Sequence, residues 1–232
     1  MDHSIISRPK HKHFPLRPAF AKLDRLLQSC LAILLINWVF QGMRGMQGKE
    51  LSFRLLFGLV VAGIAGSICW SAGAGPLLSP CMGLLVGHSA NFLVNGQFWV
   101  CARYCPSYRG NADAVALATT GLAGRLARLA WLSEAAFIGS RARGGAPSDR
   151  SDIDLRLIFP PGPAAWRRMN LLVLQLRAWA LWKHVPLDLY AYDRPDALRR
   201  FDQSEPLLIV KDDDGRLRDM FPMRCVPFGR SP

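Results

Sequence analysis

Two aspartates separated by one residue, Asp152 and Asp154, stand in a stretch where apolar and polar residues alternate. A period of two is typical of a β-strand with one buried face. The pattern therefore predicts that both carboxylates leave the same face of one strand, while Ile153 and Leu155 pack into a core on the other face. Two oxygen ligands held close together on a rigid element suit Mg²⁺, which proteins bind through one or two carboxylates together with substrate phosphates.

A Gly-Ser pair stands before this strand and could supply the phosphate-binding half of such a site. Gly139 and Ser140 follow the apolar run of residues 136–138, and glycine allows a sharp turn and a close approach to a ligand. We expect a short helix to begin near Ser140, with its free N–H groups and its positive end facing a triphosphate. Arg141 and Arg143 add positive charge there, and each fits either a phosphate contact or ordinary surface charge.

A third carboxylate follows in a second alternating segment, residues 185–192. Asp188 is the only acidic residue of this segment, and it shares a face with Tyr190 and Tyr192. If this strand pairs beside the strand of Asp152, Asp188 would serve as a general base or share a metal ion. The alternative is an exposed strand aspartate with no catalytic role.

These motifs together resemble a known superfamily. Gly139-Ser140, a gap of eleven residues and Asp152-Ile153-Asp154-Leu155 are similar to the pattern of the DNA polymerase β-like nucleotidyltransferases. The segment GSRARGGAPSDRSDIDL looks most like the minimal, single-domain members. The resemblance covers roughly residues 132–217, a little over a third of the chain.

The resemblance implies both a fold and an activity. The fold would be a small mixed α/β (α+β) sheet with flanking helices. Two Mg²⁺ ions would be held by Asp152, Asp154 and Asp188, and a nucleoside monophosphate would pass from an NTP to an acceptor. The nucleotide would lie against the turn of Gly139 and Ser140, with Arg141 and Arg143 beside it.

Two further helices complete the expected domain. Asn111 is a suitable N-cap for a helix over residues 112–132, which leads into the first strand. Residues 164–184 carry apolar side chains on two sides. A helix with two apolar sides is expected to lie between the sheet and either another helix or the membrane surface.

The overall charge narrows the classes of partner. The chain of 232 residues carries 29 Lys and Arg against 17 Asp and Glu, a formal net charge of +12. Such an excess favours a polyanionic partner: a nucleic acid, a nucleotide or an anionic membrane surface. No zinc-finger spacing, RNA-recognition aromatic motif or recognition helix is evident, so no specific nucleic acid binding is expected.

Apolar runs in the first half predict a membrane region. Residues 55–74 are free of formal charge and long enough to span a bilayer. Residues 76–101 form a second uncharged run, which becomes polar in its later half. A third run, residues 26–40, is only marginally long and predicts either a third span or a helix in the membrane interface.

Positive charge predicts the topology of these runs. Lys and Arg are frequent in residues 1–25 and 44–54 and follow the last run at Arg103 and Arg109, whereas the turn at residues 73–79 has none. The positive-inside rule then predicts an integral cell-membrane hairpin with its turn outside. The expected organisation is a basic cytoplasmic tail (1–25), a membrane-associated helical region (26–105) and a cytoplasmic nucleotidyltransferase domain (106–232).

Polar residues and cysteines in the membrane region allow several interpretations. His88, Asn91 and Asn95 share one helix face, where they would either hold helices together or bind an acceptor. The six cysteines show no metal-ligand spacing. Cys30 is interpreted as a small apolar residue, and no disulfide framework is expected in a cytoplasmic domain.

The sequence thus predicts a membrane-anchored, Mg²⁺-dependent nucleotidyltransferase. The acceptor is not identified by any motif and would be a lipid-linked compound, a small molecule or a protein. One alternative is nucleotidylation of a partner protein as regulation. The other is a catalytically inactive membrane scaffold or nucleotide sensor, against which the intact carboxylates argue.

Overall fold

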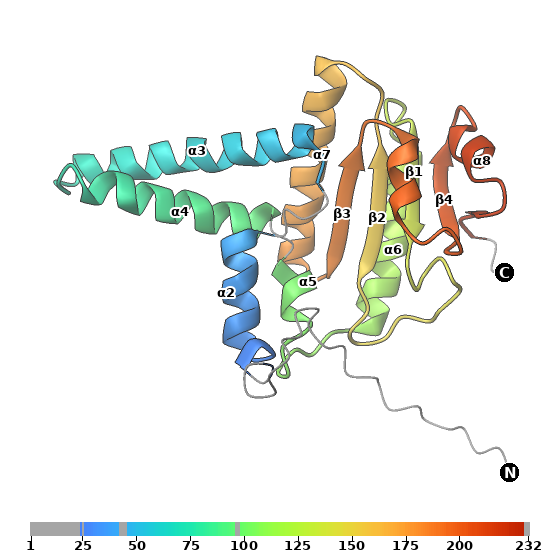
Figure 1. Cartoon of the computed structure of the whole chain (residues 1–232), viewed down its shortest axis with the longest axis horizontal. Coiled ribbons are helices and arrows are strands. Elements are labelled where there is room, and N and C mark those ends of the chain that lie inside the picture. Colours follow the sequence, from blue (N-terminus) through green and yellow to red (C-terminus); the bar gives the residue numbers. More distant parts are fainter. Residues whose placement is uncertain (1–23, 25, 42–45, 96–97, 230–232) are drawn as a thin grey trace, which may run out of the picture.

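The computed structural model describes residues 24, 26–41, 46–95 and 98–229. The expected cytoplasmic tail, residues 1–25, lies outside the described residues except for Asp24. The described chain forms an α/β domain and a long helical hairpin that projects from one side of it (Figure 1).

Five strands form one mixed sheet in the order β3-β2-β1-β4-β5. The strands are β1 (Glu134–Ile138), β2 (Ile153–Ile158), β3 (Leu187–Tyr192), β4 (Leu207–Asp212) and β5 (Cys225–Pro227). The central strand β1 runs antiparallel to both of its neighbours, whereas β2 pairs with β3, and β4 with β5, in parallel. The predicted mixed α/β sheet with flanking helices is therefore confirmed at this level.

Helices cover both faces of the sheet. One face packs against α6 (Ala112–Ala127) and α7 (Pro163–Trp182), and it buries the odd-numbered residues of β2 and β3 completely or nearly so. The other face packs against the 3₁₀ helix η1 (Pro195–Arg200) and the short α8 (Arg216–Met220). The predicted cap is present, since the Asn111 side chain accepts a hydrogen bond from the Ala114 N–H (3.0 Å).

The hairpin consists of α3 (Gly48–Ser71) and α4 (Leu78–Asn95), which lie side by side along their length (Figure 1). Small residues form the seam between them. A Cβ atom on Gly87 would lie 2.8 Å from the Cβ of Ala62, and one on Gly83 would lie 3.0 Å from the Cα of Gly66. Such spacing of small residues lets two helix backbones approach closely, a packing mode common inside membranes.

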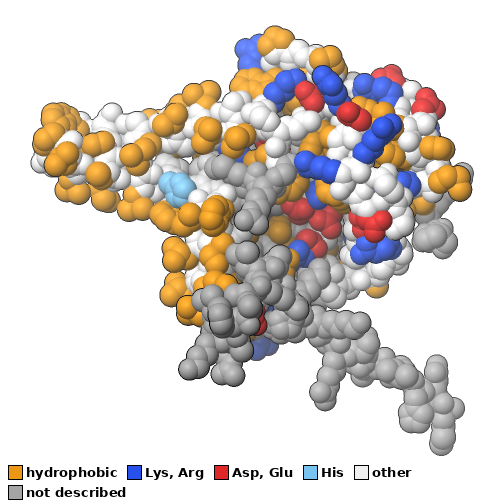
Figure 2. Space-filling model, in the orientation of Figure 1, with side chains coloured by type: hydrophobic (Ala, Val, Ile, Leu, Met, Phe, Trp, Pro, Cys, Tyr) orange, Lys and Arg blue, Asp and Glu red, His pale blue; other side chains and the backbone are white. Residues whose placement is uncertain are grey.

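The outer surface of the hairpin exposes many apolar side chains. The face seen in Figure 2 is almost without the blue and red of charged side chains. Its exposed residues include Leu56, Leu59, Val60, Ile64, Ile68, Leu78 and Leu84. Within the described ranges, α3 is the one helix that is long and apolar enough to cross a membrane, and a single such helix is weak evidence by itself.

The uncharged run of residues 76–101 does not form one continuous helix. α4 ends at Asn95, and a separate short helix, α5 (Phe98–Ala102), packs against β3. The polar half of the predicted span lies at the base of the hairpin. There, Asn95 donates a hydrogen bond to Asn91 (3.0 Å), and Asn91 donates to Gln41 (2.7 Å). Asn91 thus joins α4 to the end of α2, in agreement with the packing interpretation, whereas Asn95 bonds within α4.

The third apolar run forms α2 (Cys30–Phe40), which lies against the base of the hairpin and contacts α4 and α5. His88 on α4 lies 2.8 Å from the carbonyl oxygen of Trp38 on α2. Cys30 at the start of α2 forms a disulfide with Cys105. The interpretation of Cys30 as a plain apolar residue is therefore wrong, because tertiary packing brings together two cysteines 75 residues apart.

A buried ion pair joins the hairpin to the sheet. Glu50, in the first turn of α3, accepts a hydrogen bond from Arg177 of α7 (2.7 Å), and both side chains are almost fully buried. Glu50 also accepts from the backbone N–H of Ala191 in β3 (3.3 Å), and Arg177 donates to the carbonyl of Leu189. The hairpin thus projects from a fixed point on the domain.

Candidate active site

Three carboxylates meet where β2 and β3 begin. Asp154 in β2 stands directly opposite Asp188 in β3 because these strands pair in parallel with that register. Asp152 immediately precedes β2 and is buried. The expectation that the strand of Asp188 lies beside the strand of Asp152 is confirmed, as is the complete burial of Ile153 and Leu155 on the opposite face.

The Gly-Ser turn lies against this group. Ile138 at the end of β1 stands opposite Asp154 in the antiparallel register. Gly139 follows with a φ of +77°, and a Cβ atom there would lie 3.2 Å from the Cγ of Asp154 and closer still to its carboxylate oxygen. Any larger residue would be strained by the backbone angle and would displace the carboxylate, so glycine is required at this position.

The expected helix at Ser140 is absent, and a single closed turn takes its place. The Gly144 N–H donates to the Arg141 carbonyl (3.2 Å), and the Gly145 N–H donates to the Ser140 carbonyl (2.9 Å). With Gly144 at a φ of +75°, this is the pattern that ends a helix. Two glycines followed by Pro147 cannot continue a helix, which is why only one turn forms.

The two arginines of this loop are already engaged. Arg143 forms an ion pair with Glu205, although more than half of the Arg143 side chain is exposed. Arg141 bends back toward the Gly145 carbonyl at a distance of 3.5 Å, and its buried Nε has no partner among the described residues. Arg141 is thus the better placed of the two to contact a phosphate near Ser140.

Two other arginines, absent from the predicted site, pair with its carboxylates. Arg156 donates to the Asp188 carboxylate (2.8 Å) and to the Asp188 carbonyl (2.7 Å), and its guanidinium lies 3.8 Å from Asp154. Arg103, just after α5, forms an ion pair with Asp152, and both side chains are largely buried. Each of these aspartates therefore has a cationic partner within the protein.

Arg103 is held in place by its neighbours. Arg150, in the loop before β2, donates to the carbonyl oxygens of Arg103 (2.7 Å) and Cys105 (3.3 Å). The disulfide to Cys30 fixes the same segment to α2. α2 is therefore linked to the site through the segment that carries Arg103.

Asp154 is the carboxylate with the most perturbed acidity. Burial raises its pKa well above the ordinary value, and the neighbouring negative charges of Asp152 and Asp188 raise it further, while Arg156 opposes them. Two arginines face three carboxylates, so one negative charge is left without compensation. The group is therefore chemically suited to a further cation.

The donor set fits Mg²⁺ in chemistry, although a complete ligand geometry is not formed. All three candidate ligands present carboxylate oxygens, the donors that Mg²⁺ prefers. Within the part of the chain that the structure describes, however, no three His, Cys, Asp or Glu side chains are arranged to hold a metal ion. Asp152 and Asp188 point to their arginines instead, so metal binding requires these pairs to loosen.

Sequence reasoning missed Arg156 and Arg103 for different reasons. Arg156 follows Asp154 by two residues in a strand, and the same alternation that placed both aspartates on one face places Arg156 there too. Arg103 lies 49 positions before Asp152 in the sequence, on a segment without a local pattern. Only the fold brings those two together.

Comparisons with known proteins add no identity to this site. No protein-family model, curated protein or solved structure matches the chain. The case for a function therefore depends on the residues, their geometry and the motif resemblance.

Proposed function

We propose that this chain is a membrane-anchored nucleotidyltransferase that uses Mg²⁺ to transfer a nucleoside monophosphate from an NTP to an acceptor hydroxyl. The observation that carries the proposal is the register of Asp154 against Asp188, with Asp152 adjacent and Gly139 packed on the Asp154 carboxylate. Three carboxylates beside a glycine turn are what the polymerase β-like pattern requires, and here the carboxylates come from two segments and the turn from a third.

The chemistry assigned to this group is an in-line displacement. The acceptor oxygen forms a bond to the α-phosphorus, the bond to the β-phosphate oxygen breaks, and pyrophosphate leaves. Asp188 takes the proton of the acceptor hydroxyl, while Asp152 and Asp154 would hold Mg²⁺, which when bound neutralises charge on the phosphates. The turn of Gly139 and Ser140, with Arg141 beside it, holds the triphosphate.

The pairing arginines set a condition on this reaction. Arg103 must release Asp152, and Arg156 must share Asp188, when metal and nucleotide bind. A released Arg103 would remain close to the phosphates and stabilise their charge. The arginines thus compensate the carboxylates before substrate binds and would compensate the phosphates afterwards.

Membrane anchorage is the second part of the proposal. α3 has the length and apolarity of a span, and both helices of the hairpin expose large apolar side chains. The positive-inside rule then puts the hairpin turn outside and the α/β domain in the cytoplasm, where NTP and Mg²⁺ are available. The Cys30–Cys105 disulfide, on the domain side of the hairpin, is atypical of the cytoplasm and favours the opposite orientation.

Cysteine labelling in intact cells tests this orientation. In a background with Cys81 replaced by serine, Ala74→Cys at the hairpin turn is expected to react with a membrane-impermeant thiol reagent. Met223→Cys, on an exposed part of the domain, is expected to react only after permeabilisation. The reverse pattern would place the domain outside and remove the basis for NTP use.

Transfer of labelled nucleotide tests the activity itself. The full chain is incubated with each α-³²P-NTP, Mg²⁺ and native membranes, and the lipid, protein and RNA fractions are then separated. We expect label in one fraction with the wild type and with Asp149→Asn, an exposed aspartate of the same loop. The folded double variant Asp152→Asn, Asp154→Asn is expected to give none, and normal labelling by it would overturn the assignment.

An inactive scaffold or nucleotide sensor is the second candidate function. The ion pairs of Asp152 with Arg103 and of Asp188 with Arg156 favour it, because they already satisfy two of the three carboxylates. NTP binding without any pyrophosphate release would support this candidate. Label in the protein fraction would instead indicate nucleotidylation of a partner protein.

A further inference from the structure

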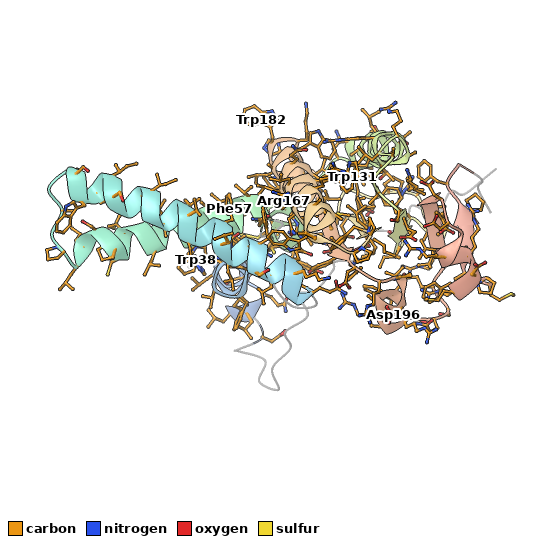
Figure 3. The ribbon with its side chains drawn as sticks, turned by 90° about the horizontal axis from the view of Figure 1, so that it is seen from above. Trp38, Phe57, Trp131, Arg167, Trp182 and Asp196 are labelled. Atoms are coloured by element: carbon orange, nitrogen blue, oxygen red, sulfur yellow. A yellow bond between two sulfur atoms is a disulfide. The ribbon has the colours of Figure 1, made fainter. Side chains whose placement is uncertain are left out.

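A cavity of about 600 Å³ lies at the base of the hairpin, between α2, α3 and α4. Trp38 on α2 forms part of its wall and lies beside the hairpin in Figure 3. This volume is within the range of ordinary small-molecule sites. The cavity is separate from the three carboxylates, and the proposed reaction does not use it.

The lining of the cavity changes from polar to apolar along the hairpin. Its polar residues, Gln41, Arg54, His88 and Asn91, lie at the end nearest the α/β domain. Toward the hairpin turn the wall becomes apolar, with Leu55, Leu59, Ala62, Leu84 and Leu85. From Arg54 to Ala62 the rise along α3 is about 12 Å. The cavity therefore has the polarity profile of an amphiphile aligned with the hairpin.

Most of the polar groups at the base are satisfied by one another. Asn91 donates to the Gln41 side chain (2.7 Å), Gln41 donates to the His88 carbonyl (2.8 Å), and His88 lies 2.8 Å from the Trp38 carbonyl. These residues build a rigid floor and leave few free donors. The remaining donor of the cavity is Arg54.

Among the described residues, no carboxylate forms an ion pair with the buried Arg54. Its side chain is 1% exposed, and it donates to the Gln41 carbonyl (2.9 Å) and to the Met46 sulfur (3.2 Å). Its Nε has no hydrogen-bond partner among the described residues. The nearby carboxylate of Glu50 is paired with Arg177. A buried guanidinium in this condition is costly unless an anion approaches it.

The position of Arg54 along the hairpin indicates where that anion comes from. Arg54 immediately precedes Leu55 and Leu56, the first of the exposed apolar residues of α3. If the exposed apolar surface lies in the hydrocarbon, Arg54 lies at the level of the lipid headgroups on the side of the domain. An acidic headgroup is the anion present at that depth.

We propose that this cavity binds an acidic phospholipid, with its phosphate on Arg54 and an acyl chain along the wall of Leu59, Ala62 and Leu85. The inference rests on the proposed membrane anchorage and not on nucleotidyl transfer. A phosphate-bearing lipid supplies the missing negative charge, and its apolar chain matches the remaining wall. The bound lipid would join α2 to the hairpin at the membrane surface.

Lipid binding by the purified full chain in detergent micelles tests the inference. Native mass spectrometry is used to titrate phosphatidic acid and phosphatidylcholine with identical acyl chains. We expect phosphatidic acid to bind at least about tenfold more tightly. Equal binding of the two lipids would overturn the proposal. Complete displacement by millimolar inorganic phosphate would also contradict it, because the ligand would then be a soluble phosphate.

Variants separate the site from general electrostatic attraction. Arg54→Gln should weaken phosphatidic acid binding about tenfold and Arg54→Lys should retain most of it. Arg167→Gln removes an exposed arginine of α7 that does not line the cavity, so it should bind like the wild type. Unchanged binding by folded Arg54→Gln would overturn the proposal.

A second variant keeps the test decisive if Arg54→Gln does not fold. Leu85→Trp enlarges a half-exposed wall residue without changing charge, and it should fill the acyl part of the cavity and reduce binding. Wild-type binding by this variant would contradict the proposed site. Asp154→Asn should bind lipid normally, so a failure of lipid binding and a failure of catalysis are distinguishable.

Discussion

The α/β domain and the helical hairpin distribute their side chains in opposite ways. In the domain, Leu155, Leu157 and Leu189 are fully buried between the sheet and its helices. In the hairpin, small and polar residues form the interior seam, and the large apolar residues face outward. The domain thus hides its large apolar side chains from solvent, whereas the hairpin exposes an apolar surface of the kind that a lipid environment would stabilise.

The same contrast applies to buried charge. At the candidate site, the buried arginines pair with carboxylates, as Arg103 does with Asp152 and Arg156 with Asp188. At the base of the hairpin, Arg54 has no such partner among the described residues. Under the proposal above, an acidic lipid headgroup would supply the negative charge that Arg54 lacks.

The largest expected effect belongs to the domain and concerns Asp188. Asp188→Asn should reduce turnover about 10²- to 10⁴-fold, the range of positioned acid-base groups. It should change NTP affinity less than Asp152→Asn does. Pyrophosphate release at saturating acceptor, measured beside NTP binding, checks this.

Asp196→Asn, an exposed aspartate on η1 labelled in Figure 3, is the control. Normal turnover by Asp188→Asn would make it an ordinary strand residue.

The next effect concerns the buried ion pair of Glu50 with Arg177, which joins the hairpin to the domain. Glu50→Ala leaves the buried Arg177 guanidinium without its carboxylate, which should lower the free energy of unfolding by about 3–5 kcal/mol. Denaturant unfolding in detergent micelles measures the loss. A decrease below about 1 kcal/mol would show that the hairpin and the domain are not joined through this pair.

The seam of the hairpin offers a matched pair of glycine substitutions. Gly83→Leu places a side chain against the α3 backbone and should cost about 3 kcal/mol or more, because the helices must separate. Gly63→Leu lies on the same hairpin with nothing within 4 Å of an added Cβ, and it should cost little. Protease resistance of the hairpin and thermal unfolding in micelles compare the two. Similar losses would mean that the seam is not packed as described.

The smallest effect concerns a surface ion pair between the start of α3 and the end of β3. Lys49 forms a partly exposed ion pair with Asp193 (2.6 Å), and this hydrogen bond lowers the pKa of Asp193. Exposed pairs contribute about 0–1 kcal/mol, so Lys49→Ala should cost no more than that at pH 7.

The pH dependence of this pair has a definite sign. A lowered folded-state pKa gives stability above the unfolded-state value, about 3.9 for Asp, and that stability is lost as the pH falls through the folded-state value. The difference between the wild type and Lys49→Ala should therefore shrink below about pH 4. Unfolding free energies at pH 7 and pH 3 test this, and a difference that grows at pH 3 would contradict the assignment.

Much of the domain could be predicted from local pattern. Alternation predicted β2 and β3. It also placed the Asp188 strand beside the Asp152 strand once a site was assumed. The period of a strand is short and strict, so the faces of these residues follow directly from sequence. The N-cap at Asn111 was predictable because its hydrogen bond is also local.

Other features depend on contacts between segments far apart in the chain. The pair of Arg103 with Asp152 and the disulfide of Cys30 with Cys105 have no local pattern. Two local errors have local causes. Gly144, Gly145 and Pro147 close the turn at Ser140 before a helix can form, and the uncharged run of residues 76–101 did not show where α4 ends at Asn95.

The central claim is that the three carboxylates of the domain act on a nucleotide while the hairpin holds the protein in a membrane. Pyrophosphate release from Mg²⁺-NTP by the purified full chain in lipid nanodiscs, supplemented with a native membrane extract as the source of acceptor, tests it most directly. We predict release that requires Mg²⁺, is abolished by Asp154→Asn and is unchanged by Asp149→Asn. Release by Asp154→Asn at the wild-type rate, or no release by the wild type with any NTP, would contradict the account.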